Sequence, residues 1–307
     1  MASRRWAIIL AAGDGERVRR LTKDGRGRTL PKQFWAPGDA GPMLRWAYER
    51  AKRLTRPARI VTVVSAHHRQ WWADLLPGAM APGLIVQPEN RGTAAGILLP
   101  LLHVLRHHRD AIVILLPADQ YVADEKQLRS SLEHACSVVE RGRRIVLLGM
   151  APHGPEPDYG WIVAGEAEED GTRRVVSFVE KPGSREAREL YRSGASVSSF
   201  MLVARGRALL ALYQAAAPAL LATLARVTQD HGLGEETGPS TLARAYASLS
   251  PLDFSRDVLQ PSASLARVLA VPPCGWTDLG TPERLERWIR SRADGGDGRP
   301  ATLETSA

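Results

Sequence analysis

A glycine-rich turn directly follows the first apolar run of the chain. The run Trp6–Leu10 leads into Ala11-Ala12-Gly13-Asp-Gly15-Glu-Arg17. Two glycines after a buried strand let the backbone turn tightly and present its N–H groups to an anion. Arg17 can hold phosphate oxygens through two parallel hydrogen bonds. The segment therefore predicts a phosphate-binding loop, with a purely structural strand-to-helix turn as the alternative. It is neither a dinucleotide-binding GxGxxG nor a Walker loop, because the further residues of those motifs are missing.

Positive charge is concentrated near this turn. The 307-residue chain carries a formal net charge of +8, and residues 1–60 alone hold 15 Lys+Arg against 5 Asp+Glu. Half of this excess lies in a basic stretch over residues 17–28, just before Pro31-Lys32-Gln33-Phe34. We interpret the stretch as a lid over a polyphosphate, with a solvated loop as the alternative. Charge confined to one loop without interleaved aromatic residues argues against a nucleic-acid surface.

Two aspartates and two lysines are the remaining charged residues with a candidate role in metal or phosphate binding. Asp119 follows the apolar run Ala111–Pro117, at the edge where open α/β sheets bind ligands. Asp278 follows the last predicted strand and precedes a helix, so the pair could hold Mg²⁺ against phosphate oxygens. Capping a helix is the alternative role for either carboxylate. Lys32 and Lys181 are two of only five lysines in an arginine-rich chain, which suggests that a compact ammonium is needed at each position.

The elements that must position these residues alternate in type. Continuous apolar strands followed by amphipathic helices predict a three-layer α/β/α fold around a mostly parallel, mixed sheet. The predicted strands of the first half are Trp6–Leu10, Arg59–Ser65, Leu84–Gln87, Ala111–Pro117 and Arg144–Met150. The predicted helices between them are Pro42–Leu54, His67–Leu76, Thr93–Arg106 and Glu125–Arg141.

The second half of the chain has a different pattern. Strands at Tyr159–Ala164, Arg174–Val179 and Ser198–Ala204 are spaced like hairpins, and a last strand is expected at Arg267–Val271. A helix-rich region over about 206–260 contains helices at Gly206–Gln229 and Ser240–Ser248. A final helix begins at Thr281-Pro282. We expect one catalytic domain over residues 1–292 and a flexible Gly-rich tail over 293–307.

Six segments together resemble the sugar-1-phosphate nucleotidyltransferases, most closely the mannose-1-phosphate guanylyltransferases. The Gly13–Arg17 turn with Pro31–Phe34 resembles the family's LAAGxGxR followed by PKQF. The other segments, in the family's order, are Gln87-Pro-Glu-Asn-Arg91-Gly-Thr93, Leu116-Pro-Ala-Asp119-Gln, Tyr159-Gly160-Trp-Ile, Phe178-Val-Glu180-Lys181-Pro and Trp276-Thr-Asp278-Leu-Gly280. They cover residues 6–290.

The resemblance implies a Rossmann-like nucleotidyltransferase fold, a reaction and a set of roles. A sugar-1-phosphate oxygen attacks the α-phosphorus of a nucleoside triphosphate and releases pyrophosphate, with Mg²⁺ as cofactor and GTP with mannose-1-phosphate as the favoured pair. By resemblance, Arg17 and Lys32 contact the triphosphate and Lys181 the sugar phosphate, and these three with Asp119 are catalytic. The other implied roles are nucleotide binding by Ala11, Ala12, Gly13, Gly15, Gln87, Arg91 and Thr93, sugar binding by Gly160, Glu180 and Ser198, and metal binding by Asp119 and Asp278.

Four departures from the family pattern concern specificity. Gly92 and Ser198 each replace an asparagine, and Phe200 replaces a glycine near the expected sugar pocket. Gln87 replaces an acidic residue, so it offers one acceptor and one donor to a base instead of two acceptors. A uridylyl-, thymidylyl- or cytidylyltransferase therefore stays open, as does a non-catalytic sugar-nucleotide-binding regulatory subunit. The intact Asp119, Lys181 and Asp278 favour an enzyme.

The remaining candidates point to structure more than to chemistry. His103, His107 and His108 share a helix face without a further ligand nearby, which favours a solvated face over a metal site. Trp71-Trp72 is interpreted as a core or interface contact. Two cysteines without metal-ligand spacing, no signal-peptide pattern and no membrane span predict a cytoplasmic protein without a nucleic-acid or membrane partner. The sequence leaves homo-oligomer formation open.

Overall fold

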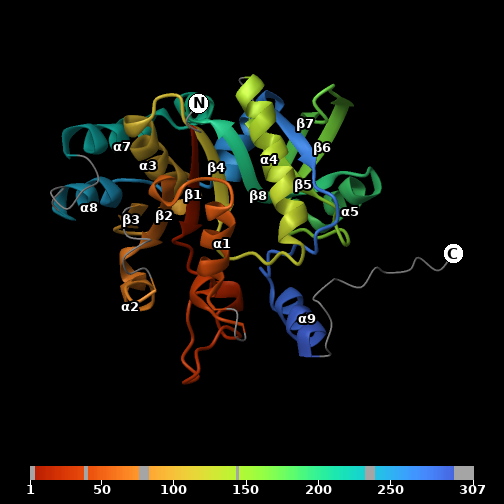
Figure 1. The fold of residues 1–307 in the computed structure, drawn as a ribbon, viewed down its shortest axis with the longest axis horizontal. Helices are drawn as coiled ribbons and strands as arrows, with labels where there is room; N and C mark the ends of the chain where they lie inside the picture. Colours follow the sequence, from red (N-terminus) through yellow and green to blue (C-terminus); the bar gives the residue numbers. More distant parts are fainter. Residues whose placement is uncertain (1–3, 38–40, 76–82, 143–144, 232–238, 294–307) are drawn as a thin grey trace.

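The carboxyl ends of parallel strands form one edge of the central sheet. In the computed structural model, which describes residues 4–37, 41–75, 83–142, 145–231 and 239–293, β1 lies between two parallel neighbours (Figure 1). The four strands of this half, in sheet order, are β3 (Leu84–Gln87), β2 (Ile60–Ser65), β1 (Arg5–Ala11) and β4 (Ile112–Pro117). All four match the predicted strands to within one residue at each end, because each is a short run of buried aliphatic residues.

The second half of the sheet is largely antiparallel. β8 (Ser196–Arg205) runs antiparallel to β4 on one side and to β5 (Ile145–Met150) on the other. β9 (Ala266–Ala270) pairs in parallel with β5. A hairpin of β6 (Gly160–Ala167) and β7 (Arg173–Glu180) completes the nine-stranded sheet over the described residues. The predicted mixed sheet and its hairpin-like second half are confirmed.

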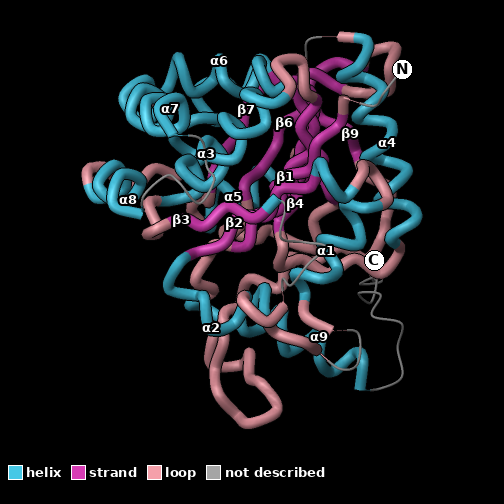
Figure 2. Tube along the Cα trace, turned by 60° about the vertical axis from the view of Figure 1, so that its left-hand side comes forward, coloured by secondary structure: helices cyan, strands magenta, loops and turns pink. Residues whose placement is uncertain are grey.

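Helices cover both faces of this sheet, as Figure 2 shows. Alternate side chains of β1 point to opposite faces, so Ile8 and Ile9 belong to different cores. Ile9 packs with α1 (Met43–Lys52) and α4 (Glu125–Arg141). On the other face, Ile8 shares a core with the helices α3 (Gly92–His107), α6 (Gly206–Ala216) and α7 (Pro218–His231). The predicted three-layer α/β/α class is therefore confirmed.

Three of the predicted helices match α1, α3 and α4 to within two residues at each end, whereas two others differ from the structure. The helix expected over His67–Leu76 is the short α2 (Arg69–Trp72) after a 3-10 turn at Ala66–His68, and Leu76 lies outside the described residues. The helix expected over Gly206–Gln229 is two helices, because Pro218 cannot donate the backbone hydrogen bond that a continuous helix requires. Helix α5 (Ser184–Arg192) was not predicted.

Three elements close the chain. Helix α8 (Pro239–Ala247) and a π-helical turn (Phe254–Leu259) fill the helix-rich region. Helix α9 (Pro282–Ala293) begins at Pro282, as predicted. All but the first residue of the predicted tail lies outside the described residues. Within the described part of the chain, no helix has the length and apolar character needed to cross a membrane.

Candidate active site

The glycine turn and the Pro31–Phe34 segment are joined by direct hydrogen bonds. Gln33 is buried, and its Nε2 donates to the carbonyl oxygens of Ala11 and Gly13 at 3.0 and 2.7 Å. Gly15 has a φ of 62°, and a Cβ there would lie 3.1 Å from the Lys32 backbone nitrogen. Glycine is therefore required at this position both by its backbone conformation and by the close passage of the second segment.

Lys32 places a desolvated cation where three motifs meet. Its side chain is 5% exposed, and Nζ lies 2.9 Å from the Asp119 carboxylate. Nζ also donates to the backbone carbonyl of Asp278. The structure thus brings together three of the predicted residues, which lie far apart in the sequence. A buried ammonium beside a carboxylate acts as a fixed positive charge with little screening by water.

Asp119 and Asp278 are brought near each other because the residues beside them in the sequence pair. Tyr121 and Thr277 exchange two backbone hydrogen bonds of 3.0 Å. Gln120 adds a side-chain link, since its Oε1 accepts from Trp276 Nε1 at 2.9 Å while its Nε2 donates to the Ser199 carbonyl. Gln120 was not assigned a role from the sequence, although its place directly after Asp119 was the available signal.

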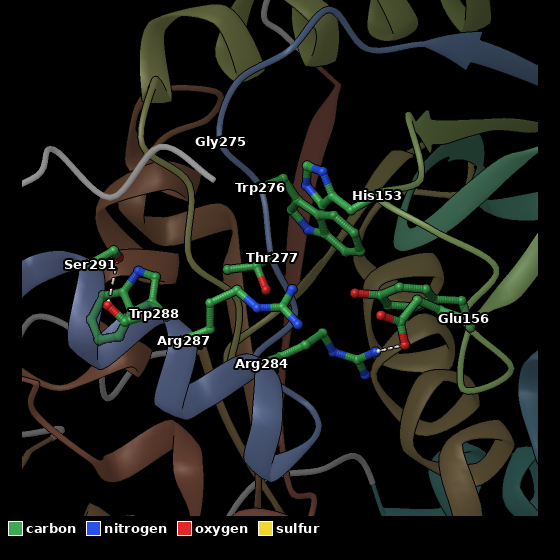
Figure 3. Close-up of a pocket in the computed structure, with 10 residues that line it drawn as sticks. His153, Glu156, Gly275, Trp276, Thr277, Arg284, Arg287, Trp288 and Ser291 are labelled. Atoms are coloured by element: carbon green, nitrogen blue, oxygen red, sulfur yellow. Dashed lines mark hydrogen bonds and ion pairs between the residues drawn. The ribbon is translucent and has the colours of Figure 1, made fainter. Parts of the chain in front are cut away.

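The Asp278 carboxylate is held by a group that was not identified from the sequence. Arg284 on α9 is 7% exposed, and its Nε lies 2.9 Å from Asp278 Oδ1. The same guanidinium bonds Glu156 at 3.1 Å, the contact drawn as a dashed line in Figure 3. It also lies over the Tyr159 ring, 4.4 Å from the centroid, and the Tyr159 hydroxyl donates to Asp278 at 3.2 Å. Burial, followed by the negative charge of Asp278, raises the pKa of Tyr159, so this hydroxyl keeps its proton.

The donor set fits Mg²⁺ at Asp119. Magnesium prefers carboxylate, phosphate and water oxygens and usually takes only one or two ligands from the protein. Both carboxylates are paired with a buried cation, Asp119 with Lys32 and Asp278 with Arg284, but Asp119 is 39% exposed and Asp278 only 20%, so Asp119 is the more accessible to a phosphate-bound ion. Asp119 therefore fits a metal-binding role on its own. The metal-binding role of Asp278 stays a prediction.

Arg17 contacts the segment that leads into Tyr159 and Gly160. Its guanidinium is 3.0 Å from the Asp158 carboxylate, which directly precedes Tyr159 and Gly160. Both side chains are about half exposed, so the pair is weak and can open for a phosphate. The basic stretch that follows is organised around Asp24, which accepts from the backbone nitrogens of Arg26 and Arg28 at 2.9 Å.

A concave site gathers the residues predicted to bind the sugar phosphate. Gly160 and Glu180 are paired across the β6–β7 hairpin, and a Cβ at Gly160 would lie 2.6 Å from Glu180 Oε2. Ser198 and Phe200 contribute from β8, and Phe200 has an unusual φ of 61°. The complete lining is Gln120, Asp158, Tyr159, Gly160, Glu180, Ser198, Phe200, Ser255, Trp276 and Asp278.

Lys181 extends from the end of β7 beside this cleft. Its Nζ lies 3.7 Å from Glu180 Oε1, and its φ of 48° turns the chain sharply after the strand. Burial raises the pKa of Glu180, and the nearby Asp253 raises it further, while Lys181 opposes both. The two members of the pair differ in exposure, because the Glu180 side chain is only 12% exposed whereas Lys181 is 55% exposed.

The predicted nucleotide segment runs from β3 into α3. Gln87 is 2% exposed, and its Nε2 has no hydrogen-bond partner among the described residues. Arg91 pairs with Glu89 at 2.7 Å. The Thr93 hydroxyl accepts from the Phe254 backbone nitrogen at 2.7 Å and donates to Asp253 at 3.2 Å, so it anchors the π-helical turn. Nucleotide contacts by these side chains stay predictions.

Two groups of histidines differ in their surroundings. His103 and His107 on α3 contact each other with ring centroids 4.5 Å apart. Asp14, His67 and His68 are the one group of three metal-capable side chains within the described ranges, and it was not identified from the sequence. Burial lowers the pKa of His68 to about 4, so its ring is neutral. Trp72 is buried and donates to the Ser65 carbonyl, which confirms its role as a core contact.

The comparisons with known proteins agree with this arrangement of motifs. Residues 6–293 match the family described as Nucleotidyl transferase. This chain belongs to the nucleotidyl transferase family. The match spans the glycine turn, the two aspartate segments and the sugar-side cleft, so it includes every predicted site residue.

Two curated relatives are named for polysaccharide synthesis. The chain is 32% identical over 189 residues to the "Xanthan biosynthesis protein XanB" of Xanthomonas campestris, a match that covers 61% of this chain and 39% of that protein. It is 28% identical over 285 residues to the "Alginate biosynthesis protein AlgA" of Pseudomonas syringae, with 89% of this chain and 56% of that protein covered. The chain thus spans about half or less of the length of these relatives.

A third relative and a solved structure have more specific names. The "Mannose-1-phosphate guanylyltransferase" of Salmonella montevideo is 32% identical over 196 residues, covering 61% of this chain and 40% of that protein. A crystal structure from Thermus thermophilus, described as a "mannose-1-phosphate geranyltransferase", superimposes with a TM-score of 0.79 at 27% identity. The superposition covers 94% of this chain and 79% of that one.

Proposed function

We propose that this protein joins a nucleoside triphosphate to a hexose-1-phosphate, giving a nucleoside diphosphate sugar and pyrophosphate. The observation that carries the proposal is the buried Lys32 ammonium between the Asp119 carboxylate and the Asp278 carbonyl. It lies where the glycine turn meets the sugar-side cleft. A reaction that joins two phosphates needs fixed positive charge at such a junction.

In this mechanism a sugar-phosphate oxygen forms a bond to the α-phosphorus, and the bond from that phosphorus to the bridging oxygen of pyrophosphate breaks. Arg17 exchanges its Asp158 contact for phosphate oxygens. Lys32 stabilises the negative charge that develops on the transferring group, and Lys181 holds the sugar phosphate. Mg²⁺ bound to Asp119, when present, would neutralise phosphate charge as a Lewis acid.

The hydroxyl groups of the sugar are assigned to the Gly160–Glu180 side. Glu180 accepts hydrogen bonds from hydroxyls, and Gly160 lets the Glu180 side chain take its place in the cleft, because a Cβ at Gly160 would collide with Glu180 and Phe178. Ser198 lies in the same cleft and accepts from the Phe200 backbone nitrogen at 3.2 Å. Hexose phosphates are the substrate class that suits this polar, small cleft.

GTP with mannose-1-phosphate is the first candidate pair, supported by the names of the relatives. A pyrimidine nucleotide is the second candidate, because the Gln87 amide offers one donor and one acceptor. That set matches the imide edge of uracil or thymine as well as the N1–H and O6 of guanine. Gln87 Nε2 has no partner in the part of the chain that the structure describes, so its donor is free for either base and the alternative is kept.

The test is pyrophosphate release from the full chain with Mg²⁺, measured over a matrix of nucleoside triphosphates and sugar-1-phosphates. We expect at least one pair to turn over, with GTP and mannose-1-phosphate fastest. The Asp119→Ala variant serves as the control for contaminating enzymes. Turnover of a different pair would overturn the specificity alone, and no turnover of any pair would overturn the proposed function.

A further inference from the structure

Three side chains with metal-binding atoms converge beside the glycine turn. Asp14 lies between Gly13 and Gly15, and His67 and His68 follow the end of β2. His67 Nε2 lies 2.8 Å and His68 Nε2 3.2 Å from the same carboxylate oxygen, Asp14 Oδ1. The ligand atoms all lie within 4.8 Å of one another. None of the three residues has a role in the proposed transfer reaction.

His68 is the buried member of the group, and among the described residues its ring nitrogens are not hydrogen-bonded. Its side chain is 1% exposed, and the 3.2 Å contact of Nε2 with Asp14 Oδ1 lacks hydrogen-bond geometry. A buried polar group without a partner is unfavourable, because it has lost its hydrogen bonds to water. The ring is fixed by edge contacts with Phe34 and Trp71, at centroid distances of 5.7 and 5.5 Å. A metal ion at Nε2 would satisfy the nitrogen that faces Asp14.

Further hydrogen bonds orient the other two side chains. Ser65 Oγ lies 2.7 Å from His67 Nδ1, and His67 Nε2 hydrogen-bonds Asp14 Oδ1 at 2.8 Å. When the proton is instead on Nδ1 and bonded to Ser65, the Nε2 lone pair faces Asp14 and can bind a cation placed between them. Asn90 Nδ2 donates to the second oxygen, Asp14 Oδ2, at 2.7 Å and leaves Oδ1 toward the histidines. Support of this kind for both histidine and carboxylate is typical of metal sites.

The spacing and chemistry of the three atoms favour a small transition-metal ion. Two ligands held about 2.0–2.1 Å from zinc at a tetrahedral angle are about 3.3 Å apart, near the 2.8 and 3.2 Å that separate Asp14 Oδ1 from the two histidine nitrogens. Two imidazoles and one carboxylate suit Zn²⁺ and its first-row neighbours, whereas Mg²⁺ prefers an all-oxygen set. We propose that Asp14, His67 and His68 bind one Zn²⁺-class ion, with the fourth position open to water or phosphate.

Such an ion would join segments that border the predicted nucleotide site. Asp14 belongs to the glycine turn, the histidines follow β2, and Asn90 precedes the start of α3. Binding would therefore hold the turn against the ends of β2 and β3. Because the folded chain presents all three ligands together, the ion should raise the melting temperature. The site is separate from the Lys32–Asp119 centre, and the inference does not rest on the proposed function.

The test is Zn²⁺ binding by the untagged full chain after removal of metals, measured by competition with a chromophoric chelator. We expect one equivalent to bind and to raise the melting temperature. Co²⁺ substitution should give the visible absorption of a four-coordinate site. His67→Gln and Asp14→Asn should each weaken binding by about 10- to 100-fold and abolish the thermal shift, and Ser65→Ala should weaken it by about tenfold.

The matched control is His107→Gln, which alters the histidine pair on α3 and should leave binding unchanged. His67 is 51% exposed, so its replacement is compatible with folding, which far-UV circular dichroism checks. The proposal is overturned if the wild-type chain binds no Zn²⁺ at micromolar concentration. It is also overturned if binding persists in both His67→Gln and Asp14→Asn or is lost in His107→Gln.

Discussion

At the scale of single residues, Lys32 is the group on which the proposed chemistry depends most. Its ammonium is nearly inaccessible to solvent and is fixed by two oxygen atoms, so it needs no reorganisation when charge develops on the transferring phosphate. Arginine is no substitute there, because its planar fork is larger and requires different hydrogen-bond directions.

Replacement of Lys32 tests this role. We expect Lys32→Met to lower kcat by about 10²- to 10³-fold, the usual effect of removing one donor that stabilises developing charge. Lys32→Arg should recover little of the loss. Pre-steady-state measurement of product formation reports the rate of the transfer step. Lys52→Met, at an exposed position, is the control. A kcat within threefold of wild type for Lys32→Met would contradict the assignment.

Phe200 is the residue expected to limit the size of the sugar. It lines the cleft with Gly160 and Glu180, in a backbone conformation that favours glycine. Phe200→Gly should raise kcat/KM for a bulkier hexose-1-phosphate at least about tenfold relative to an unsubstituted one. Phe200→Ala removes the same ring but keeps a side chain at the unfavourable φ. It should therefore show the same substrate preference as Phe200→Gly, with a lower free energy of unfolding than that variant. An unchanged ratio in both variants would exclude Phe200 as a specificity residue.

The partly buried Glu180 carboxylate should make the KM for the sugar phosphate depend on pH on the acid side. Its carboxylate form accepts hydrogen bonds from sugar hydroxyls, and burial raises its pKa. Glu180 therefore takes up a proton at a higher pH than an ordinary glutamate as the solution is acidified. The KM for the sugar phosphate should rise as the pH falls through this pKa, which steady-state kinetics over a pH series measures.

Glu180→Gln provides the comparison for that dependence on pH. An amide does not titrate, so the variant should show a flatter KM profile, although its KM is higher near neutral pH. Ionisation of the substrate phosphate is common to both enzymes, so the difference between the two profiles isolates Glu180. Identical profiles would show that another group causes the dependence on pH.

At the scale of secondary-structure elements, α9 supports the second aspartate. Arg284 links Asp278, Glu156 and the Tyr159 ring, and thereby connects the helix to two segments of the cleft. A helix at this position was predicted from its Thr281-Pro282 start, but the inward direction of Arg284 was not. Arginines are frequent in this chain, and only packing distinguishes the buried one.

Removing that guanidinium should affect folding as well as activity. Arg284→Met leaves two carboxylates partly buried without their cation, and we expect a loss of about 3 kcal/mol in the free energy of unfolding. Urea denaturation measures it. Arg290→Met breaks an exposed pair with Glu286 on the same helix and should lose less than about 0.5 kcal/mol. Equal losses in the two variants would contradict the supporting role.

The sequence predicts elements here better than it predicts contacts. Buried aliphatic runs such as Ile112–Pro117 identify strands, because few other arrangements can bury six consecutive apolar residues. Local patterns do not reveal that Gln33 ties two motifs together or that His67 and His68 meet Asp14. These contacts depend on which strand ends become neighbours, and that is decided by the order of strands in the sheet.

At the scale of the whole molecule, half of the positive excess of residues 1–60 lies in the basic stretch between the glycine turn and the Pro31–Phe34 segment. Asp24 and Asp158 already pair with two of its arginines, Arg28 and Arg17. A charge distribution of this kind attracts a compact polyphosphate more than a polymer, whose binding requires an extended basic track.

Ionic strength tests this distinction. The KM for the nucleoside triphosphate should rise as salt increases, because screening weakens the attraction between exposed charges. Random-sequence RNA should show no saturable binding at about 0.15 M salt, measured by fluorescence anisotropy. Tight RNA binding with a steep salt dependence would assign the basic stretch to a nucleic acid instead.

The most direct test of the central claim follows the phosphorus atoms of the nucleotide. With the best substrate pair, a label on the α-phosphate should appear in the sugar nucleotide, and a label on the γ-phosphate should appear in pyrophosphate. Asp119→Asn should slow both transfers together by at least about 10²-fold. Release of the γ-label as inorganic phosphate with no α-label on the sugar would contradict nucleotidyl transfer. Wild-type rates in Asp119→Asn would contradict the proposed centre.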